Sequence, residues 1–282
     1  MKIQKMLSVW LICLIMASCK SSQEVKGAET QGADIFYLSK YEQTVPAFNG
    51  QQESALGISF SLVDTELSAE PERRGSPPVQ ASLAGLVRSI LYDGHSAKEY
   101  ADGVIESLTR EYREALASNE EWASDIPWAW EYDEEHTITI RDFCALVDRT
   151  IYTYMGGAHP NTEITHFVID VHTPQRFLLD DIILKAGFTR LKPIVERELR
   201  AYSELLSSEP LPPDAPLSQG IFLEDDFEMN DYYPAPDGLH FCWNAYDLAA
   251  YVYGPIEITV PWSELEGLLS PKGVRMADAF RL

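Results

Sequence analysis

Two amphipathic patterns of helical spacing, set among runs that look like strands, constrain the fold of this chain most. Residues 96–118 and 187–207 repeat apolar side chains every three to four positions, which predicts one buried stripe on each helix. Residues 35–45, 56–67 and 136–157 alternate in polarity or are rich in β-branched and aromatic residues, as strands are. Helices and strands do not alternate regularly. The order therefore predicts an α+β fold in which antiparallel sheets pack with a few amphipathic helices, as two intertwined subdomains.

Shorter elements fill the rest of the pattern. Ser96 and Glu99 fit a capping box at the start of the helix over 96–118. Residues 136–157 predict a β-hairpin whose turn falls near Leu146 to Arg149. The proline-rich and charged stretch 69–80 predicts an exposed loop. Further expected elements are a helix at 81–94, short strands at 220–225, 237–244 and 255–262, and a turn of helix at 263–269.

The first residues have the pattern of an export signal. Lys2 and Lys5 precede an apolar run from Leu7 to Ala17, and a cationic start before roughly 7–15 apolar residues is typical of a secretory signal peptide. A spanning helix needs about 20 apolar residues, so this run is too short to be one. The sequence LIMASC resembles the lipobox of bacterial lipoproteins, with Cys19 as the lipidated residue, although Met16 stands where leucine is more common. The alternative is an ordinary signal peptide that happens to contain a cysteine.

These features divide the chain into four predicted segments. Residues 1–18 are the lipoprotein signal peptide, and the polar, small residues 19–33 are a flexible tether. Residues 34–135 form an N-terminal α+β subdomain, and residues 136–282 form a C-terminal α+β domain. A lipid on Cys19 would hold the folded part at a membrane of the cell envelope, on its periplasmic or its outer side.

The charge of the chain restricts its partners. It has 22 basic and 44 acidic residues and a formal net charge of -22. Such a charge repels nucleic acid and anionic lipid headgroups and attracts a cationic protein or peptide. An acidic surface that serves only solubility is the commoner explanation.

Polar and aromatic clusters each allow two interpretations. Asp180 and Asp181 form a general acid–base pair or, more simply, accept backbone hydrogen bonds at a helix start. The acidic runs 131–135 and 224–228 bind calcium or, as we expect, lie on solvated loops. The aromatic residues of 120–135 either form a binding surface or close the edge of a core, and we favour the second interpretation. They are Trp122, Trp128, Trp130 and Tyr132.

The histidines and cysteines do not define a metal site. His159 follows Gly156 and Gly157, so it is displayed at a loop tip or bonds to the backbone of a tight turn. His166 and His172 lie at opposite ends of one strand, about 20 Å apart at roughly 3.3 Å per residue. Cys144 and Cys242 form a disulfide or remain free in the core.

No familiar catalytic motif is present, so we expect neither an enzyme nor a cofactor. The chain has no Gly-x-Ser-x-Gly elbow, no His-Glu-x-x-His, no P-loop and no dinucleotide fingerprint.

Two segments resemble an extracytoplasmic domain family that the anti-sigma factor RsiV shares with the peptidoglycan deacetylase PdaC. Tyr152 to Ile183, YTYMGGAHPNTEITHFVIDVHTPQRFLLDDII, resembles the core motif. Leu239 to Leu265, LHFCWNAYDLAAYVYGPIEITVPWSEL, resembles the second signature. Together they cover about residues 140–270. The sigma-binding segment and transmembrane helix of RsiV have no counterpart before the apolar run. The deacetylase domain of PdaC has no counterpart after the residues that carry the resemblance.

The resemblance implies a binding module on a cell-envelope lipoprotein. Its ligand would be a lysozyme-like cationic protein or peptidoglycan, and the candidate binding residues are Gly156, Gly157, His159 and Asn161. The alternative is an enzyme that acts on cell-wall glycan, or an accessory to one, with His159 at its centre.

Overall fold

The computed structural model describes residues 25–26, 36–46, 55–65, 77–118, 129–207, 211–212 and 214–281. The predicted signal peptide and Cys19 lie outside these residues, as do Trp122, Trp128 and most of the predicted loop 69–80. Within the described ranges, no helix is both long enough and apolar enough to cross a membrane.

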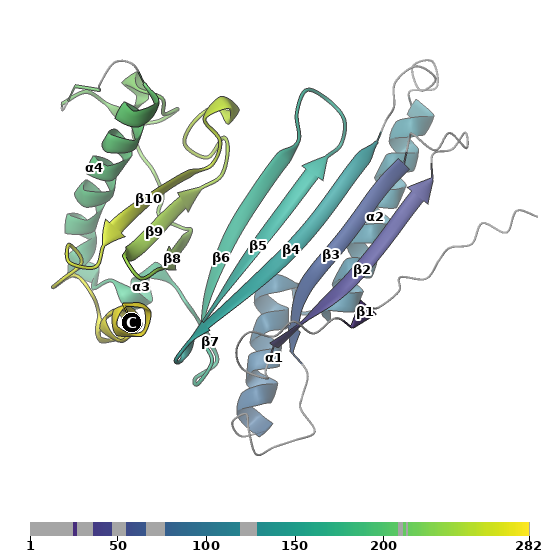
Figure 1. The fold of residues 1–282 in the computed structure, drawn as a ribbon, viewed down its shortest axis with the longest axis horizontal. Helices are drawn as coiled ribbons and strands as arrows, with labels where there is room; N and C mark the ends of the chain where they lie inside the picture. Colours follow the sequence, from purple (N-terminus) through teal and green to yellow (C-terminus); the bar gives the residue numbers. More distant parts are fainter. Residues whose placement is uncertain are drawn as a thin grey trace, which may run out of the picture.

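Seven strands form a large sheet in which they follow each other in sequence order (Figure 1). Neighbouring strands are antiparallel except β3 and β4, which run parallel. A parallel pair needs a crossover connection, and two helices between β3 and β4 provide it. The strands are β1 (Val25–Lys26), β2 (Phe36–Pro46), β3 (Ala55–Thr65), β4 (Trp130–Arg141), β5 (Cys144–Tyr154), β6 (Asn161–Asp170) and β7 (Gln175–Phe177). The short strand β1 falls within the expected tether.

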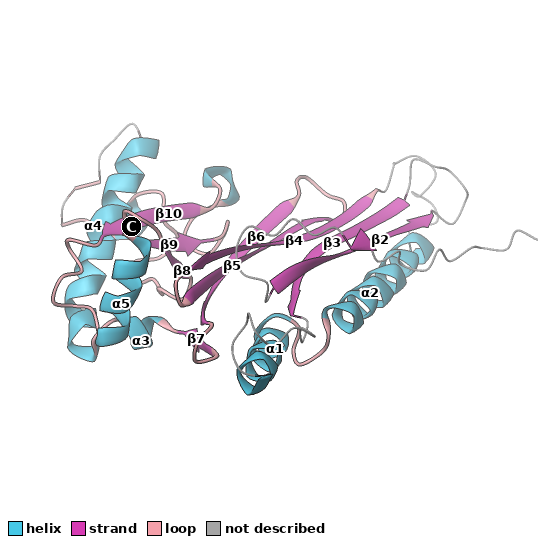
Figure 2. Ribbon diagram, turned by 60° about the horizontal axis from the view of Figure 1, so that its bottom comes forward, coloured by secondary structure: helices cyan, strands magenta, loops and turns pink. Residues whose placement is uncertain are grey.

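The two crossover helices, α1 (Pro77–Leu91) and α2 (Ala97–Ser118), cover one face of the large sheet (Figure 2). The stripe predicted for α2 packs inward, with Leu108 and Tyr112 buried. The capping box is confirmed, because Ser96 Oγ accepts from the Glu99 amide at 3.2 Å and Glu99 Oε2 accepts from the Ser96 amide at 2.9 Å. Trp130 and Tyr132 are buried in this first core, as expected for aromatic residues that close its edge.

A second core lies between the small sheet and three helices. The small sheet has the order β10-β9-β8 and is antiparallel throughout. The elements are α3 (Leu179–Ile182), α4 (Phe188–Leu206), β8 (Tyr232–Pro234), β9 (Gly238–Trp243), β10 (Ile256–Pro261) and α5 (Pro271–Phe280). Cys144, Leu146 and Val168 from the large sheet belong to this core, whereas Ala145 and Ile169 beside them belong to the first. Strands β5 and β6 therefore join the two halves, and the expected boundary between residues 135 and 136 falls inside β4.

The α+β class predicted from the pattern is confirmed, but the predicted turn of the hairpin is wrong. Strands β4 and β5 meet at Asp142 and Phe143, and Leu146 to Arg149 are paired residues of β5. Asp142 has a φ of 50°, a left-handed conformation that aspartate tolerates in turns.

Two predictions near the C-terminus are also wrong. Residues 220–225 form a loop with one isolated bridge, from Phe222 to Ala249, because their carboxylates favour solvent over a paired strand. Residues 263–269 form turns, and the helix begins later, where the Ser270 hydroxyl accepts from the Gly273 amide and Pro271 occupies the first turn.

Candidate functional site

The loop that joins β5 to β6 meets the loop that joins β9 to β10, so the two segments of the resemblance come together in space. The ring of His159 stacks on Tyr251, with centroids 3.6 Å apart and planes 15° apart. The Tyr246 hydroxyl lies 3.3 Å from His159 Nε2. On the other side of the imidazole, Nδ1 lies 2.9 Å from the Pro160 carbonyl oxygen. We call Tyr152, His159, Tyr246 and Tyr251 the aromatic corner.

Backbone conformation places these rings at the surface. Gly156 and Gly157 have φ values of 83° and 101°, which a side chain would oppose, so the glycines allow the tight turn before His159. Tyr246 has a φ of 75°, a strained conformation for a residue with a large side chain. A hydrogen bond from its amide to the Ala249 carbonyl, at 3.0 Å, holds this loop. Tyr246 is nevertheless 55% exposed, so the strain displays an aromatic ring to solvent rather than burying it.

Carboxylates of β4 lie beside the aromatic corner. Tyr152 is paired with Asp133 across strands β4 and β5, and Glu131 is paired with Tyr154. Desolvation and the negative charges of Glu131 and Asp133 raise the pKa of Tyr152 above its ordinary value. The corner therefore combines exposed rings with negative charge, an arrangement that attracts cations to aromatic faces.

The candidate residues from the sequence separate into two groups. Gly156, Gly157 and His159 share the loop at the corner, and Asn161 is the first residue of β6, where it pairs with Thr153. His172 lies in the turn between β6 and β7, at the opposite end of β6 from the corner loop. In the described part of the chain, no group of three or more His, Cys, Asp or Glu side chains is arranged to hold a metal ion.

Two side chains that flank the strands of the small sheet, Asp231 before β8 and Asn244 after β9, close the open edge of β6. The Asn244 side chain accepts from the Ile164 amide at 2.8 Å and donates to the Ile164 carbonyl at 3.0 Å. Asp231 Oδ1 accepts from the His166 amide at 3.0 Å, and the imidazole of His166 lies 3.1 Å from the same carboxylate. These contacts satisfy backbone groups that an edge strand otherwise exposes, and they fix the β9–β10 loop beside the corner.

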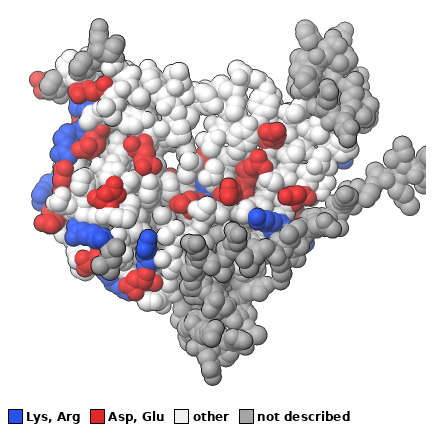
Figure 3. All heavy atoms as spheres, viewed as in Figure 1, with Lys and Arg blue, Asp and Glu red and all other residues white. Residues whose placement is uncertain are grey.

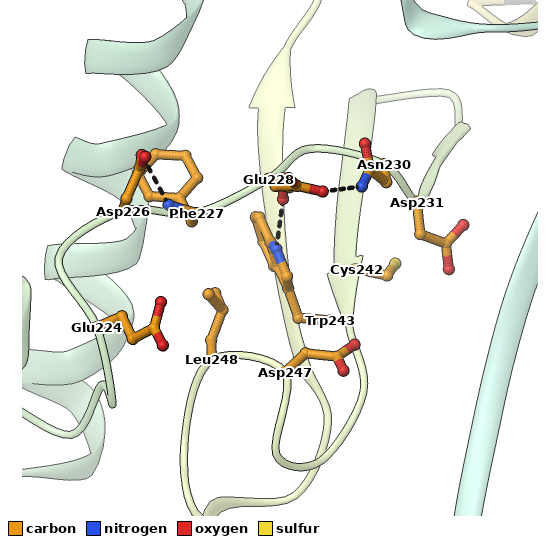
Figure 4. A pocket seen from close by; sticks show the side chains of 10 residues that line it. All are labelled: Glu224, Asp226, Phe227, Glu228, Asn230, Asp231, Cys242, Trp243, Asp247 and Leu248. Carbon is orange, nitrogen blue, oxygen red and sulfur yellow. Dashed lines mark hydrogen bonds between the residues drawn. The ribbon is translucent and has the colours of Figure 1, made fainter.

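An acidic pocket of about 500 Å³ lies on the other side of Asp231 (Figure 4). The indole of Trp243 forms part of its wall and donates to the Glu228 carbonyl at 2.7 Å. The acidic run 224–228, expected on a solvated loop, contributes three of the lining carboxylates. The residues that line the pocket are Glu224, Asp226, Phe227, Glu228, Asn230, Asp231, Cys242, Trp243, Asp247 and Leu248.

Asp181, the second of the paired acids in the first turn of α3, has the simpler of the two expected roles. Asp181 Oδ2 accepts from the Leu178 amide at 3.0 Å, and its other oxygen pairs with Lys272 at 3.1 Å. Burial alone would raise the pKa of Asp181, but these two partners lower it below its ordinary value. Cys144 and Cys242 are both free, so the disulfide alternative does not hold in this structure.

A buried polar network between β4, β5 and α2 was not expected from the sequence. Glu134 lies at its centre, with its side chain fully buried. One carboxylate oxygen accepts from Arg149 Nε at 2.8 Å and lies 2.9 Å from His136 Nε2. The other accepts from the hydroxyls of Tyr100 at 2.8 Å and Tyr132 at 2.7 Å. We call these five residues the buried network.

The partners of Glu134 keep it ionised. Burial by itself raises the pKa of Glu134, but the hydrogen bond from His136 and the charge of Arg149 outweigh that effect and lower the pKa below its ordinary value. The same surroundings raise the pKa of Tyr100 to about 12, mainly through burial and the charge of Glu134.

These observations define the class of the protein: an α+β protein whose second core is built from a three-stranded sheet and its helices. Residues 180–263, most of that core, match a protein-family model described as "Protein of unknown function (DUF3298)". The matched range includes the β9–β10 loop of the aromatic corner but not the loop that carries His159.

Two solved structures have a similar fold. A member of the DUF3298 family from Bacteroides fragilis is 21% identical and superposes with a TM-score of 0.68, covering 86% of this chain and 97% of its own. A DUF3298 family protein from Pseudomonas aeruginosa is 15% identical, with a TM-score of 0.55 and coverage of 84% and 94%. No protein of curated function matches this chain in sequence.

Proposed function

We propose that this chain is a non-catalytic cell-envelope lipoprotein whose folded part binds its ligand at the aromatic corner. One observation carries the proposal: two loops 80 or more residues apart in sequence come together to display His159, Tyr246 and Tyr251 at the surface, with Tyr246 in a strained conformation. Tyrosine is one of the residue types that are enriched among the few residues that carry most of the binding energy at protein interfaces.

The chemistry of the corner favours a cationic ligand. The carboxylates of Glu131 and Asp133 lie beside it, and the whole chain has a net charge of -22. The resemblance to RsiV and PdaC supports a lysozyme-like protein as this cationic ligand. A peptidoglycan fragment, which is not cationic, is the second candidate and would bind through the exposed rings of the corner. Either would approach an envelope protein that is exposed to the cell wall.

Binding to a defined probe tests the corner. Full-length protein in detergent micelles is titrated with lysozyme and, separately, with soluble peptidoglycan fragments in a calorimeter. We expect one of the two to bind, and Tyr246→Ala and His159→Ala each to weaken that binding about tenfold, as loss of an interface hot spot does.

Leu205→Ala is the matched control, because Leu205 is 83% exposed and lies on α4, which belongs to neither loop of the corner. It should leave affinity unchanged. Thermal melts of all variants show whether the fold is intact. Failure of both probes to bind the wild-type protein would remove the proposed ligand class.

Membrane anchoring has a separate test. Mass spectrometry of the mature N-terminus should find an acylated Cys19, and a Cys19→Ala variant should lose the lipid and leave the membrane fraction. Recovery of an unprocessed and unmodified N-terminus from the wild-type protein would contradict the lipoprotein proposal.

A further inference from the structure

One face of the large sheet is left uncovered by the helices. Helices α1 and α2 lie on the opposite face (Figure 2). Strand β4 shows the division clearly, because Trp130, Tyr132 and Glu134 are buried while Glu131, Asp133 and Glu135 between them are exposed. Residues directly opposite in neighbouring strands share a face, so the strand pairings extend the uncovered face from β4 to β2 and β3 on one side and to Thr150 and Tyr152 of β5 on the other. The rest of this face on β5 and β6 is covered, because Cys144, Leu146 and Val168 are buried in the second core.

The side chains on this face are mostly short. The middle rows run from Ser59 to Asp133 to Tyr152, and from Ser61 to Glu135 to Thr150. Serine and threonine leave a sheet face flat, so a second surface can approach closely along several strands. Figure 3 shows Asp and Glu side chains gathered over the middle of this face.

Carboxylates outnumber basic groups there. Among the described residues of β2 to β6, the acidic side chains that the pairings place on this side of the sheet are Glu42, Glu131, Asp133, Glu135, Asp148 and the buried Asp170, and the basic ones are Lys40 and Arg141. Lys40 lies on β2, near the edge of the sheet, and Arg141 lies at the end of β4.

The carboxylates of β4 on the two faces of the sheet differ in their ion pairing. The buried Glu134 is paired with Arg149, but within the described part of the chain no lysine or arginine forms an ion pair with Glu131, Asp133 or Glu135. Three carboxylates at every second position of one strand repel each other, and a cation brought from outside would relieve that repulsion.

We propose that this uncovered face, with the aromatic corner at one end, is the docking surface for a folded protein with a basic face. The inference rests on the proposed function and adds the extent of the footprint and the kind of partner. Charge complementarity selects a cationic partner over anionic lipid or glycan.

The size of the face selects a folded protein over a short peptide. Four strands about 4.8 Å apart and about eight residues long, at roughly 3.3 Å per residue, present about 500 Å². The corner and its loops extend this area toward the roughly 800 Å² per partner of a standard protein interface. An extended peptide would cover only a narrow strip of it.

Charge reversal on matched sites tests the proposal. Full-length protein in detergent micelles is titrated with lysozyme at low and physiological salt, and with succinylated lysozyme, which keeps the protein's size but loses its positive charge. The face variant carries Glu131→Lys and Glu135→Lys. The control carries Glu106→Lys and Glu114→Lys, two exposed positions on α2 behind the sheet, with the same change in net charge.

We expect the face variant to bind lysozyme at least about tenfold more weakly and with a shallower salt dependence, and the control to lose less than about threefold. Succinylated lysozyme should not bind. Equal losses in both variants, or no loss in the face variant, would overturn the docking face.

The outcomes separate the two proposals. If Tyr246→Ala weakens lysozyme binding and the face variant does not, the corner stands and the docking face is wrong. If the wild-type protein binds peptidoglycan fragments but not lysozyme, the docking face is again wrong while the proposed function stands. If it binds neither probe, both proposals fail.

Discussion

Replacing Glu134 by alanine would remove the centre of the buried network and leave Arg149 without its carboxylate. Loss of one partner of a buried ion pair lowers the free energy of unfolding by about 3–5 kcal/mol. The Arg149 side chain is 24% exposed, so water would solvate part of its charge, and we expect the lower end of that range, about 3 kcal/mol. Each 1 kcal/mol shifts Tm by about 2–4 °C in a domain of this size, which gives a fall in Tm of about 6–12 °C.

Urea unfolding and thermal melts followed by circular dichroism measure both quantities. Glu106→Ala is the control, because Glu106 is an exposed residue of α2 and its loss should change stability by less than about 0.5 kcal/mol. Adding Arg149→Met to Glu134→Ala should cost little more, since it removes the charge that the first change left unpaired. A loss below about 1 kcal/mol for Glu134→Ala would refute the view that the network stabilises the fold.

Three further predictions follow from the packing and the pKa shifts. The pKa of Glu134 is lowered in the folded state, so its contribution to stability is present above the ordinary glutamate pKa and is lost as pH falls through the lowered value. The urea concentration at the midpoint of unfolding should therefore decrease below about pH 4.3, and it should decrease less in Glu134→Gln. Gly273→Ala should lower the free energy of unfolding in urea by more than about 2 kcal/mol, because a Cβ there would lie 2.2 Å from the Ile182 carbonyl oxygen. Gly103→Ala is the control and should be neutral or stabilising, because a Cβ on this exposed part of α2 would have nothing within 4 Å. Burial raises the pKa of the Cys144 thiol to about 12, so iodoacetamide at pH 8 should not label Cys144 until urea unfolds the chain. Peptide mass spectrometry measures the labelling, and a labelled Cys144 in the native protein would contradict its burial.

Much of the fold could be predicted because local patterns carry it. The stripes of α2 and α4 and the alternation of β2 and β3 are visible in the sequence, since one face of each element must be buried. The parallel pairing of β3 with β4 is not visible, because strand direction depends on the path of the chain through α1 and α2. The predicted position of the hairpin turn is wrong because β-branched residues continue on both sides of Asp142, and only the left-handed conformation of Asp142 marks the turn.

The candidate site could be predicted only in part. The glycines and His159 indicated a displayed loop, but the stacking of His159 on Tyr251 joins residues far apart in sequence. The prediction that the acidic run 131–135 lies on a solvated loop is wrong, because these residues belong to β4 and Glu134 is buried. Its alternation with Trp130 and Tyr132 in β4 was a signal for burial, although the sequence alone does not provide the partner, Arg149, that makes burial of the charge tolerable.

The parallel pair β3–β4 also sets the order in which the molecule can assemble during synthesis. Ser59 and Asp133, neighbours in the sheet, are separated by 74 positions in the chain. The β2–β3 hairpin is therefore made well before its partner strand, and it waits with an unpaired edge while both helices are synthesised. That interval exposes the nascent chain to mispairing, and a slow folding phase that depends on β4 is the kinetic signature we expect of it.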